Sequence, residues 1–264
     1  MNICIMTDLE GISGIYCREQ VIPGQWRFDE GRRYLTREVN ICAEACKAAG
    51  VDKVYVRDGH GGGYTLLWDK LGEAVDAVSV GTTTDNIRYV EVDDCDAYIL
   101  LGYHAMAGTH NGVLEHTMSS TSVQNYWLND VRIGEVALDA AGLTDHGKPV
   151  IMVSGDSAVC AEAKQFLPRV ITAEVKKGFG LFGATMLPPA QAEKCIRESV
   201  AKAIAAYRAG EYDLYPTEKP VRLRVEKMER IQIPNVASKP YMKIIDGRTY
   251  EVVADTVEEA LFRL

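Results

Sequence analysis

Two acidic side chains stand two residues apart near the beginning of the chain, in the segment Asp8-Leu9-Glu10. In an extended segment residues i and i+2 face the same way, so the two carboxylates are expected to lie side by side. Two like charges at this spacing repel each other unless water or a cation screens them. Because the pair follows an apolar, strand-like run at residues 2–8 and precedes Gly11, the sequence favours a bound cation over open water.

Two histidines occupy equivalent positions in the sequence. His60 follows the apolar run 51–56, and His104 follows the apolar run 97–101. If these runs are strands of one parallel sheet, their C-terminal ends meet at one edge, which is where open α/β sheets bind ligands. A lone loop histidine is more often solvated than a ligand, and only the shared edge favours a metal site. Carboxylates and imidazoles together suit Zn²⁺, with Mn²⁺ or Co²⁺ as possible substitutes.

The helices and strands predicted around these side chains indicate an α/β fold. Apolar residues recur every three or four positions over 29–49, which predicts a helix, and a second long helix is expected over 190–209. A strand before and after the first helix forms a unit that builds parallel sheets with right-handed crossovers. With a further strand at 149–154, we expect a three-layer sandwich with a mainly parallel sheet.

The C-terminal part of the chain has a different pattern. Residues 221–225 alternate apolar with charged side chains, and residues 243–252 contain an Asp-Gly pair that is typical of a β-hairpin turn. We therefore expect an α/β metal-binding catalytic domain over residues 1–187 and a smaller α+β domain over residues 188–264.

Composition excludes several classes of protein. Of the 264 residues, 47% are hydrophobic and 25% charged, which is typical of a globular protein. The net charge of −8 argues against a nucleic-acid partner, because phosphate binding needs clustered Lys and Arg. No uncharged apolar run is long enough to cross a membrane, and no secretory signal is recognisable. The odd number of cysteines, seven, suits a reducing compartment. We expect a cytoplasmic protein.

Five segments, in this order, resemble motifs of the D-aminopeptidase family of zinc peptidases, which is peptidase family M55 and is often described as dipeptide transport protein. The segments are Thr7-Asp-Leu-Glu-Gly-Ile-Ser-Gly14, Arg57-Asp-Gly-His-Gly61, Leu101-Gly-Tyr-His-Ala105, Gly112-Val-Leu-Glu-His-Thr-Met118 and Ile133-Gly-Glu-Val-Ala-Leu138. The resemblance is clearest in this part of the chain and looser in the remainder.

The resemblance implies a centre of two zinc ions with five ligands, which are Asp8, Glu10, His60, His104 and Glu135. It implies that Asp8 bridges both ions. Glu10 and His104 would then complete one coordination sphere, and His60 and Glu135 the other. Three carboxylates against two divalent ions leave about one positive charge, which lowers the pKa of bound water and favours the oxyanion of peptide hydrolysis. Without the resemblance, Glu135 would be an ordinary first-turn glutamate of a helix.

The resemblance also implies that His116 is the catalytic histidine. We assign it a general acid/base role, because an imidazole near the metals could carry a proton from the attacking water to the leaving amine. A role as nucleophile is the alternative. His110 and His146 match no family segment, and we expect them to be surface groups.

The function implied is a zinc-dependent aminopeptidase that removes an N-terminal D-amino acid from short peptides or amides, through a hydroxide bound to the dinuclear centre. The family also implies a homo-oligomeric ring, a decamer in its best-known case. One alternative is a dinuclear-metal phosphoesterase, which needs extra Arg or Lys near the site, where only Arg57 is close in sequence. The other is a non-enzymatic peptide-binding protein, which would need export.

Overall fold

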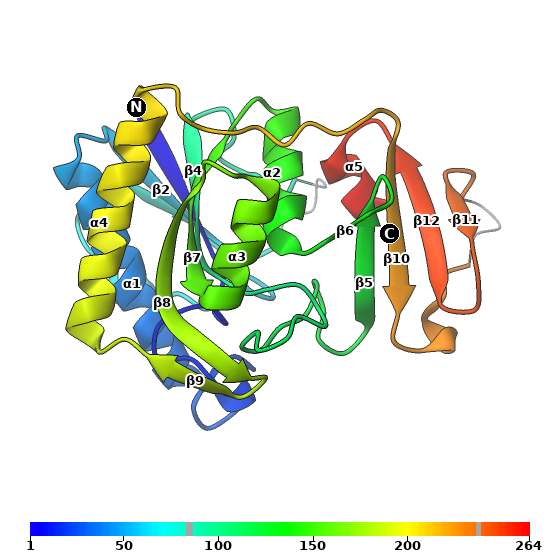
Figure 1. The fold of residues 1–264 in the computed structure, drawn as a ribbon, viewed down its shortest axis with the longest axis horizontal. Coiled ribbons are helices and arrows are strands. Elements are labelled where there is room, and N and C mark those ends of the chain that lie inside the picture. The colour runs from blue at the N-terminus through cyan, green and yellow to red at the C-terminus, as the bar shows by residue number, and fades with distance from the viewer. Residues whose placement is uncertain (83–86, 236–238) are drawn as a thin grey trace.

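The computed structural model describes residues 1–82, 87–235 and 239–264, and it contains two β-sheets (Figure 1). The larger sheet has seven strands, which are β1 (Asn2–Thr7), β2 (Lys53–Asp58), β3 (Ala77–Ser79), β4 (Ala97–Tyr103), β7 (Val150–Asp156), β8 (Ile171–Gly180) and β9 (Gly183–Met186). Their order is β3-β2-β1-β4-β7-β8-β9. All neighbours are parallel except β9, which is antiparallel to β8.

Helices cover both faces of this sheet. The helices are α1 (Phe28–Ala48), α2 (Glu135–Asp145), α3 (Ser157–Phe166) and α4 (Pro189–Arg208). Successive residues of a strand face opposite sides, so Ile3 and Ile5 of β1 pack in one core with α1 and α4. Cys4 and Met6 pack in the other core with α2 and α3. The predicted three-layer sandwich is thereby confirmed, and the two long helices predicted from periodicity lie within one residue of their expected bounds.

The second sheet is antiparallel and lies beside the first (Figure 1). Its strands are β5 (Val123–Leu128), β6 (Val131–Ile133), β10 (Val221–Lys227), β11 (Met242–Ile244) and β12 (Thr249–Ala254), in the order β11-β12-β10-β5-β6. Helix α5 (Val257–Phe262) packs on it. Strands β11 and β12 pair as the Asp-Gly signal predicted, and the Asp246 side chain closes the turn by accepting the N–H groups of Arg248 and Thr249.

Both sheets draw on both parts of the chain. Helix α4 packs against α1 and β8 of the larger sheet, whereas β5 and β6, from the first half of the chain, pair in the smaller one. The division into domains at residues 187 and 188 stays a prediction. In the described part of the chain, no helix is long and apolar enough to cross a membrane.

Candidate metal centre

Three parallel strands end together at one edge of the larger sheet. The register pairs Thr7, the last residue of β1, with Asp58 of β2 on one side and with Leu101 of β4 on the other. Asp8 follows β1 directly, His60 follows β2 by two residues and His104 follows β4 directly. The structure therefore brings these three side chains to one place, as the strand-end pattern predicted.

Glycines let the loop after β1 lie directly against the end of β4. Gly102 has a φ of +78°, and a Cβ atom there would overlap the Asp8 carbonyl oxygen. A Cβ atom on Gly11 would likewise overlap the Tyr103 carbonyl oxygen. The N–H of Asp8 donates to Leu101 O at 2.8 Å, and that of Gly11 donates to Gly102 O at 2.7 Å. These contacts hold the backbone on both sides of Glu10.

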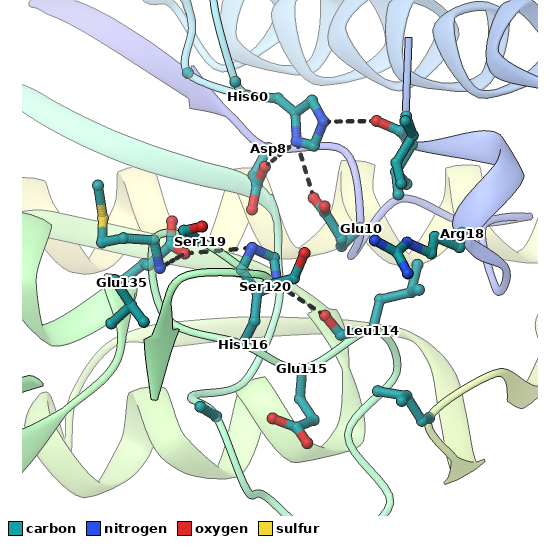
Figure 2. A pocket seen from close by; sticks show the side chains of 18 of the residues that line it. Asp8, Glu10, Arg18, His60, Leu114, Glu115, His116, Ser119, Ser120 and Glu135 are labelled. Atoms are coloured by element: carbon teal, nitrogen blue, oxygen red, sulfur yellow. Dashed lines mark hydrogen bonds and ion pairs between the residues drawn. The ribbon is translucent and has the colours of Figure 1, made fainter. Parts of the chain in front are cut away.

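The carboxylate of Asp8 lies between the imidazoles of His60 and His104, and Figure 2 shows its contact with His60. Its Oδ1 is 2.9 Å from His60 Nδ1, and its Oδ2 is 3.2 Å from His104 Nε2. Glu10 Oε2 lies 3.0 Å from the same His60 nitrogen, and Glu135 Oε1 lies 3.3 Å from the same His104 nitrogen. The side chains thus form two groups of potential ligands, and Asp8 contacts both.

The contacts divide these residues differently from the division that the family resemblance implied. Glu10 lies against His60, and Glu135 lies against His104. Among the described residues no ion pair joins Glu10 to His104 or His60 to Glu135. The sheet order gives the reason, because β2 and β4 flank β1 on opposite sides and α2, which begins at Glu135, packs on the β4 side.

The donor atoms fit a bound cation. Asp8 Oδ2, Glu10 Oε2 and His104 Nε2 are buried and have no hydrogen-bond partner among the described residues, although each lies close to another polar atom. Buried polar atoms without partners are rare in proteins and call for an ion or a water. Tetrahedral zinc with bonds of about 2.0–2.1 Å holds neighbouring donors about 3.3 Å apart. The separations of 3.0, 3.2 and 3.3 Å match this spacing.

Backbone carbonyl groups orient all three histidines of the site. His60 Nε2 lies 2.9 Å from Val21 O, His104 Nδ1 lies 3.0 Å from Ala105 O, and His116 Nδ1 lies 2.9 Å from Leu114 O. A carbonyl oxygen only accepts, so each of these nitrogens donates a hydrogen. The other nitrogen of His60 and of His104 faces the carboxylates, which is the arrangement of a metal-ligating histidine.

The electrostatics of the groups are those of a cation site. Burial disfavours the charged form of His60 and of His104, but the neighbouring carboxylates outweigh it and hold both pKa values well above the ordinary range. Burial also works against the charge of Asp8, yet the two imidazoles hold the pKa of that carboxyl well below its usual range. Since a proton and a metal ion compete for the same imidazole nitrogen, metal affinity at this site is expected to fall in acid.

His116 lies over the second group of ligands. Its ring stacks on that of His104, with centroids 4.0 Å apart and an interplanar angle of 15°, and its Nε2 is 3.9 Å from Glu135 Oε1. Leu114 and Met118, on either side, have φ values of 55° and 62°, a strained region for residues other than glycine. Hydrogen bonds from Leu114 N to Leu181 O and from Met118 N to Glu135 Oε1 stabilise this loop.

Lys176 supports the loop that follows β1 and carries Glu10, a role that was not identified from the sequence. This buried residue of β8 donates to three carbonyl oxygens, those of Glu10 at 2.5 Å, Ile12 at 2.9 Å and Ile15 at 2.7 Å. Burial lowers the pKa of Lys176 to about 8, although nearby carboxylates favour its charge. An ordinary strand lysine gives no sequence signal of such a role, because the role depends on contacts with a segment more than 160 positions away.

We expect Lys176→Met to lower the free energy of unfolding by about 2–4 kcal/mol, because three buried carbonyl oxygens lose their donor while the relieved burial of a charge offsets part of the loss. Urea unfolding measures this change. The control is Lys177→Met, since Lys177 is the exposed neighbour on the same strand. Equal stability of the two variants would contradict the supporting role of Lys176.

A cavity of about 600 Å³ opens onto these groups. The predicted residues that line it are Asp8, Glu10, His60, His116 and Glu135, while His104 lies buried behind the ring of His116. Two further residues that the sequence did not indicate, Arg18 and Arg88, also line the cavity.

Three residues considered from the sequence lie outside this lining. Arg57, the one basic residue noted near the site in sequence, instead donates to Gly81 O at 2.8 Å. His110 is exposed, and His146 lies 3.3 Å from Glu258.

Comparisons with known proteins match the whole chain. The profile of a peptidase family, M55, described as D-aminopeptidase, matches residues 1–264. A D-aminopeptidase of Bacillus subtilis (strain 168) is 29% identical over 258 residues, which is 98% of this chain and 90% of that protein. A solved structure of the zinc-dependent D-aminopeptidase DppA from Bacillus subtilis, a self-compartmentalizing protease, superposes with a TM-score of 0.91 at 28% identity, over 100% of this chain and 95% of that one.

Proposed function

The chain belongs to the D-aminopeptidase family, peptidase family M55, and on this basis we propose that it is a zinc-dependent aminopeptidase that releases an N-terminal D-residue from short peptides. The observation that carries the proposal is the position of Asp8, whose two carboxylate oxygens lie 2.9 and 3.2 Å from two different imidazoles. A carboxylate in that position can bridge two cations, and a dinuclear centre is suited to the hydrolysis of a peptide bond.

Five side chains are the proposed ligands of two zinc ions. Asp8 Oδ1, Glu10 and His60 would hold one ion, and Asp8 Oδ2, His104 and Glu135 would hold the other, following the contacts of the two imidazoles with the carboxylates. When bound, the ions supply Lewis acidity, which acidifies water and polarises a peptide carbonyl group. The carboxylates carry three negative charges, so two divalent ions leave the centre about one charge positive.

His116 is the proposed general acid and base. Its Nδ1–H is held by Leu114 O, so its Nε2 is the nitrogen that is free to exchange a proton, and the ring lies on the wall of the cavity. The imidazole would accept a proton from the attacking water and donate it to the nitrogen of the leaving amine, while stacking on His104 fixes the plane of the ring.

We also propose that the chain assembles into a closed homo-oligomer, a ring such as the family resemblance implies. The similar DppA structure is that of a self-compartmentalizing protease. Large apolar side chains of this chain are available for such an interface, since Trp26, Trp68 and Phe179 are exposed. Light scattering of the purified protein would measure the assembly, and a monomer at micromolar concentration would contradict it.

Metal analysis and a stereochemical assay test the proposed activity together. We expect about two zinc ions per chain and hydrolysis of D-alanyl-D-alanine but not of its L,L isomer, with activity lost on chelation and restored by zinc. Fewer than about one tightly bound metal per chain, with no activity after zinc is added, would contradict the dinuclear centre. A preference for the L,L isomer would contradict only the assignment of substrate. The phosphoesterase and the binding protein considered from the sequence predict no hydrolysis of either peptide.

A further inference from the structure

We propose that Arg18 binds the terminal carboxylate of the substrate, so that the enzyme selects short peptides with a free C-terminus over their amides. The inference rests on the proposed aminopeptidase function and names the chemistry that the same cavity recognises. It starts from the charged side chains of the cavity wall that are neither proposed metal ligands nor the proposed catalytic histidine.

Among the residues that the structure describes, two arginines line the cavity, and one of them is already paired. Arg88 donates to the buried carboxylate of Asp139 from Nε at 2.6 Å and from Nη2 at 3.0 Å. The hydroxyl groups of Tyr89 and Tyr103 donate to the same carboxylate, at 3.0 and 2.8 Å. The charge of Arg88 is therefore neutralised inside the protein, and its guanidinium is committed to the wall.

Arg18 has no such commitment. It is exposed and, within the described ranges of the chain, forms no ion pair. Figure 2 shows its guanidinium group turned towards the cavity, on the side where Glu10 lies. Among the described residues that line the cavity, Arg18 is thus the arginine whose charge is not paired with a carboxylate of the protein.

Side-chain hydrogen bonds of Gln20 stabilise the turn that carries Arg18. Arg18 begins the short helix η1 (Arg18–Gln20), and the buried amide of Gln20 accepts the N–H groups of Tyr16 and Cys17 and donates to Gly14 O. The next residue, Val21, supplies the carbonyl oxygen that orients His60. One turn therefore carries both the carbonyl group that orients a proposed metal ligand and the backbone from which the Arg18 side chain extends at the cavity wall.

A peptide carboxylate is the group that matches these features. A guanidinium binds a carboxylate through two parallel hydrogen bonds, a geometry that an amide cannot reproduce with the same charge. In a dipeptide the carboxylate lies one residue beyond the scissile bond, so a cation on the wall of the reaction cavity can reach it. The volume of about 600 Å³ is within the range of pockets for small ligands. Leu114, Leu181 and Phe182 line the same cavity and can contact apolar side chains.

The test compares D-alanyl-D-alanine with its C-terminal amide in the zinc-loaded full-length protein. Arg18→Met removes the charge and keeps much of the length, and we expect it to raise KM for the acid about tenfold, a modest factor because the site is exposed to water. The kcat for the acid and both constants for the amide should change by less than about twofold, because Arg18 does not reach the reacting atoms. Arg18→Lys should restore part of the preference for the acid. Arg33→Met, at an exposed arginine of α1 outside the cavity lining, is the matched control.

Two results would overturn the proposal. One is an equal loss of kcat/KM for the acid and for the amide in Arg18→Met, which would mean that Arg18 acts on the fold or the metal centre. The other is a change in oligomeric mass of Arg18→Met, which would make Arg18 an assembly contact. If the wild type hydrolyses neither peptide, the aminopeptidase function itself fails. Calorimetric titration of zinc-loaded His116→Ala with the acid, with and without Arg18→Met, then still measures whether Arg18 binds the carboxylate.

Discussion

Asp8→Asn is expected to lower kcat/KM by at least about three orders of magnitude and to reduce bound zinc from about two ions per chain to one or fewer. The substitution keeps the shape of the side chain, but it removes a negative charge and replaces one oxygen with an amide nitrogen. That nitrogen cannot bind a metal ion, and whichever imidazole it faces, His60 or His104, loses one of its two carboxylate neighbours. Elemental analysis and steady-state kinetics measure the two effects.

The same variant distinguishes a role of Asp8 in metal binding from a purely structural role in ion pairs with the histidines. If Asp8 bridges cations, zinc should stabilise the wild type against urea by more than it stabilises the variant, because the variant binds fewer ions. If Asp8 serves only to pair with the histidines, its loss should destabilise the protein by about 3–5 kcal/mol, as does the breaking of a buried pair, and zinc should stabilise neither protein. Asp69→Asn, at an exposed carboxylate, controls for the change in net charge. Full zinc content in Asp8→Asn would exclude the bridging role.

His116→Ala is expected to lower kcat by about 10²- to 10⁴-fold while KM and zinc content stay near the wild-type values. The reason is that His116 contributes a proton-transfer group at the cavity wall, whereas His104, Glu135 and Asp8 are the proposed ligands of the nearer ion. Stopped-time assays at saturating zinc and elemental analysis of the same preparation measure the outcome.

Two further variants sharpen this prediction. His116→Phe keeps a ring to stack on His104 and should be as inactive as His116→Ala, because the stacking alone moves no proton. His110→Ala, at an exposed histidine outside the cavity lining, should keep full activity. Loss of about one zinc ion from His116→Ala would make His116 a ligand instead, which its place beside His104 and Glu135 would allow.

Local patterns in the sequence were sufficient to predict the layers of the fold. The three- and four-residue spacing of apolar side chains predicted the helices over 29–49 and 190–209, and the apolar runs predicted the central strands. These signals are reliable because a helix or a strand that buries one face must repeat its apolar residues at its own period. Strands β3, β5, β6, β8 and β9 and helices α3 and α5 were not predicted.

Part of the candidate site was also predictable from the positions of its residues relative to the predicted strands. Asp8, His60 and His104 each follow a strand, and parallel strands end at one edge, so their convergence follows from the fold class alone. Glu135 and His116 were identified only through the family resemblance, because a first-turn glutamate and a loop histidine carry no signal of their own.

By itself, therefore, the sequence determined the α/β class, the family and the identity of the candidate ligands. The tertiary structure alone decided that Glu10 lies against His60 and Glu135 against His104, because this depends on which strands flank β1. It also decided that Lys176 donates to carbonyl oxygens of the loop after β1 and that Arg18, within the described ranges of the chain, forms no ion pair at the cavity. Such contacts join residues that lie far apart in the chain. They depend on side-chain direction and strand order, and neither of these leaves a local periodicity in the sequence.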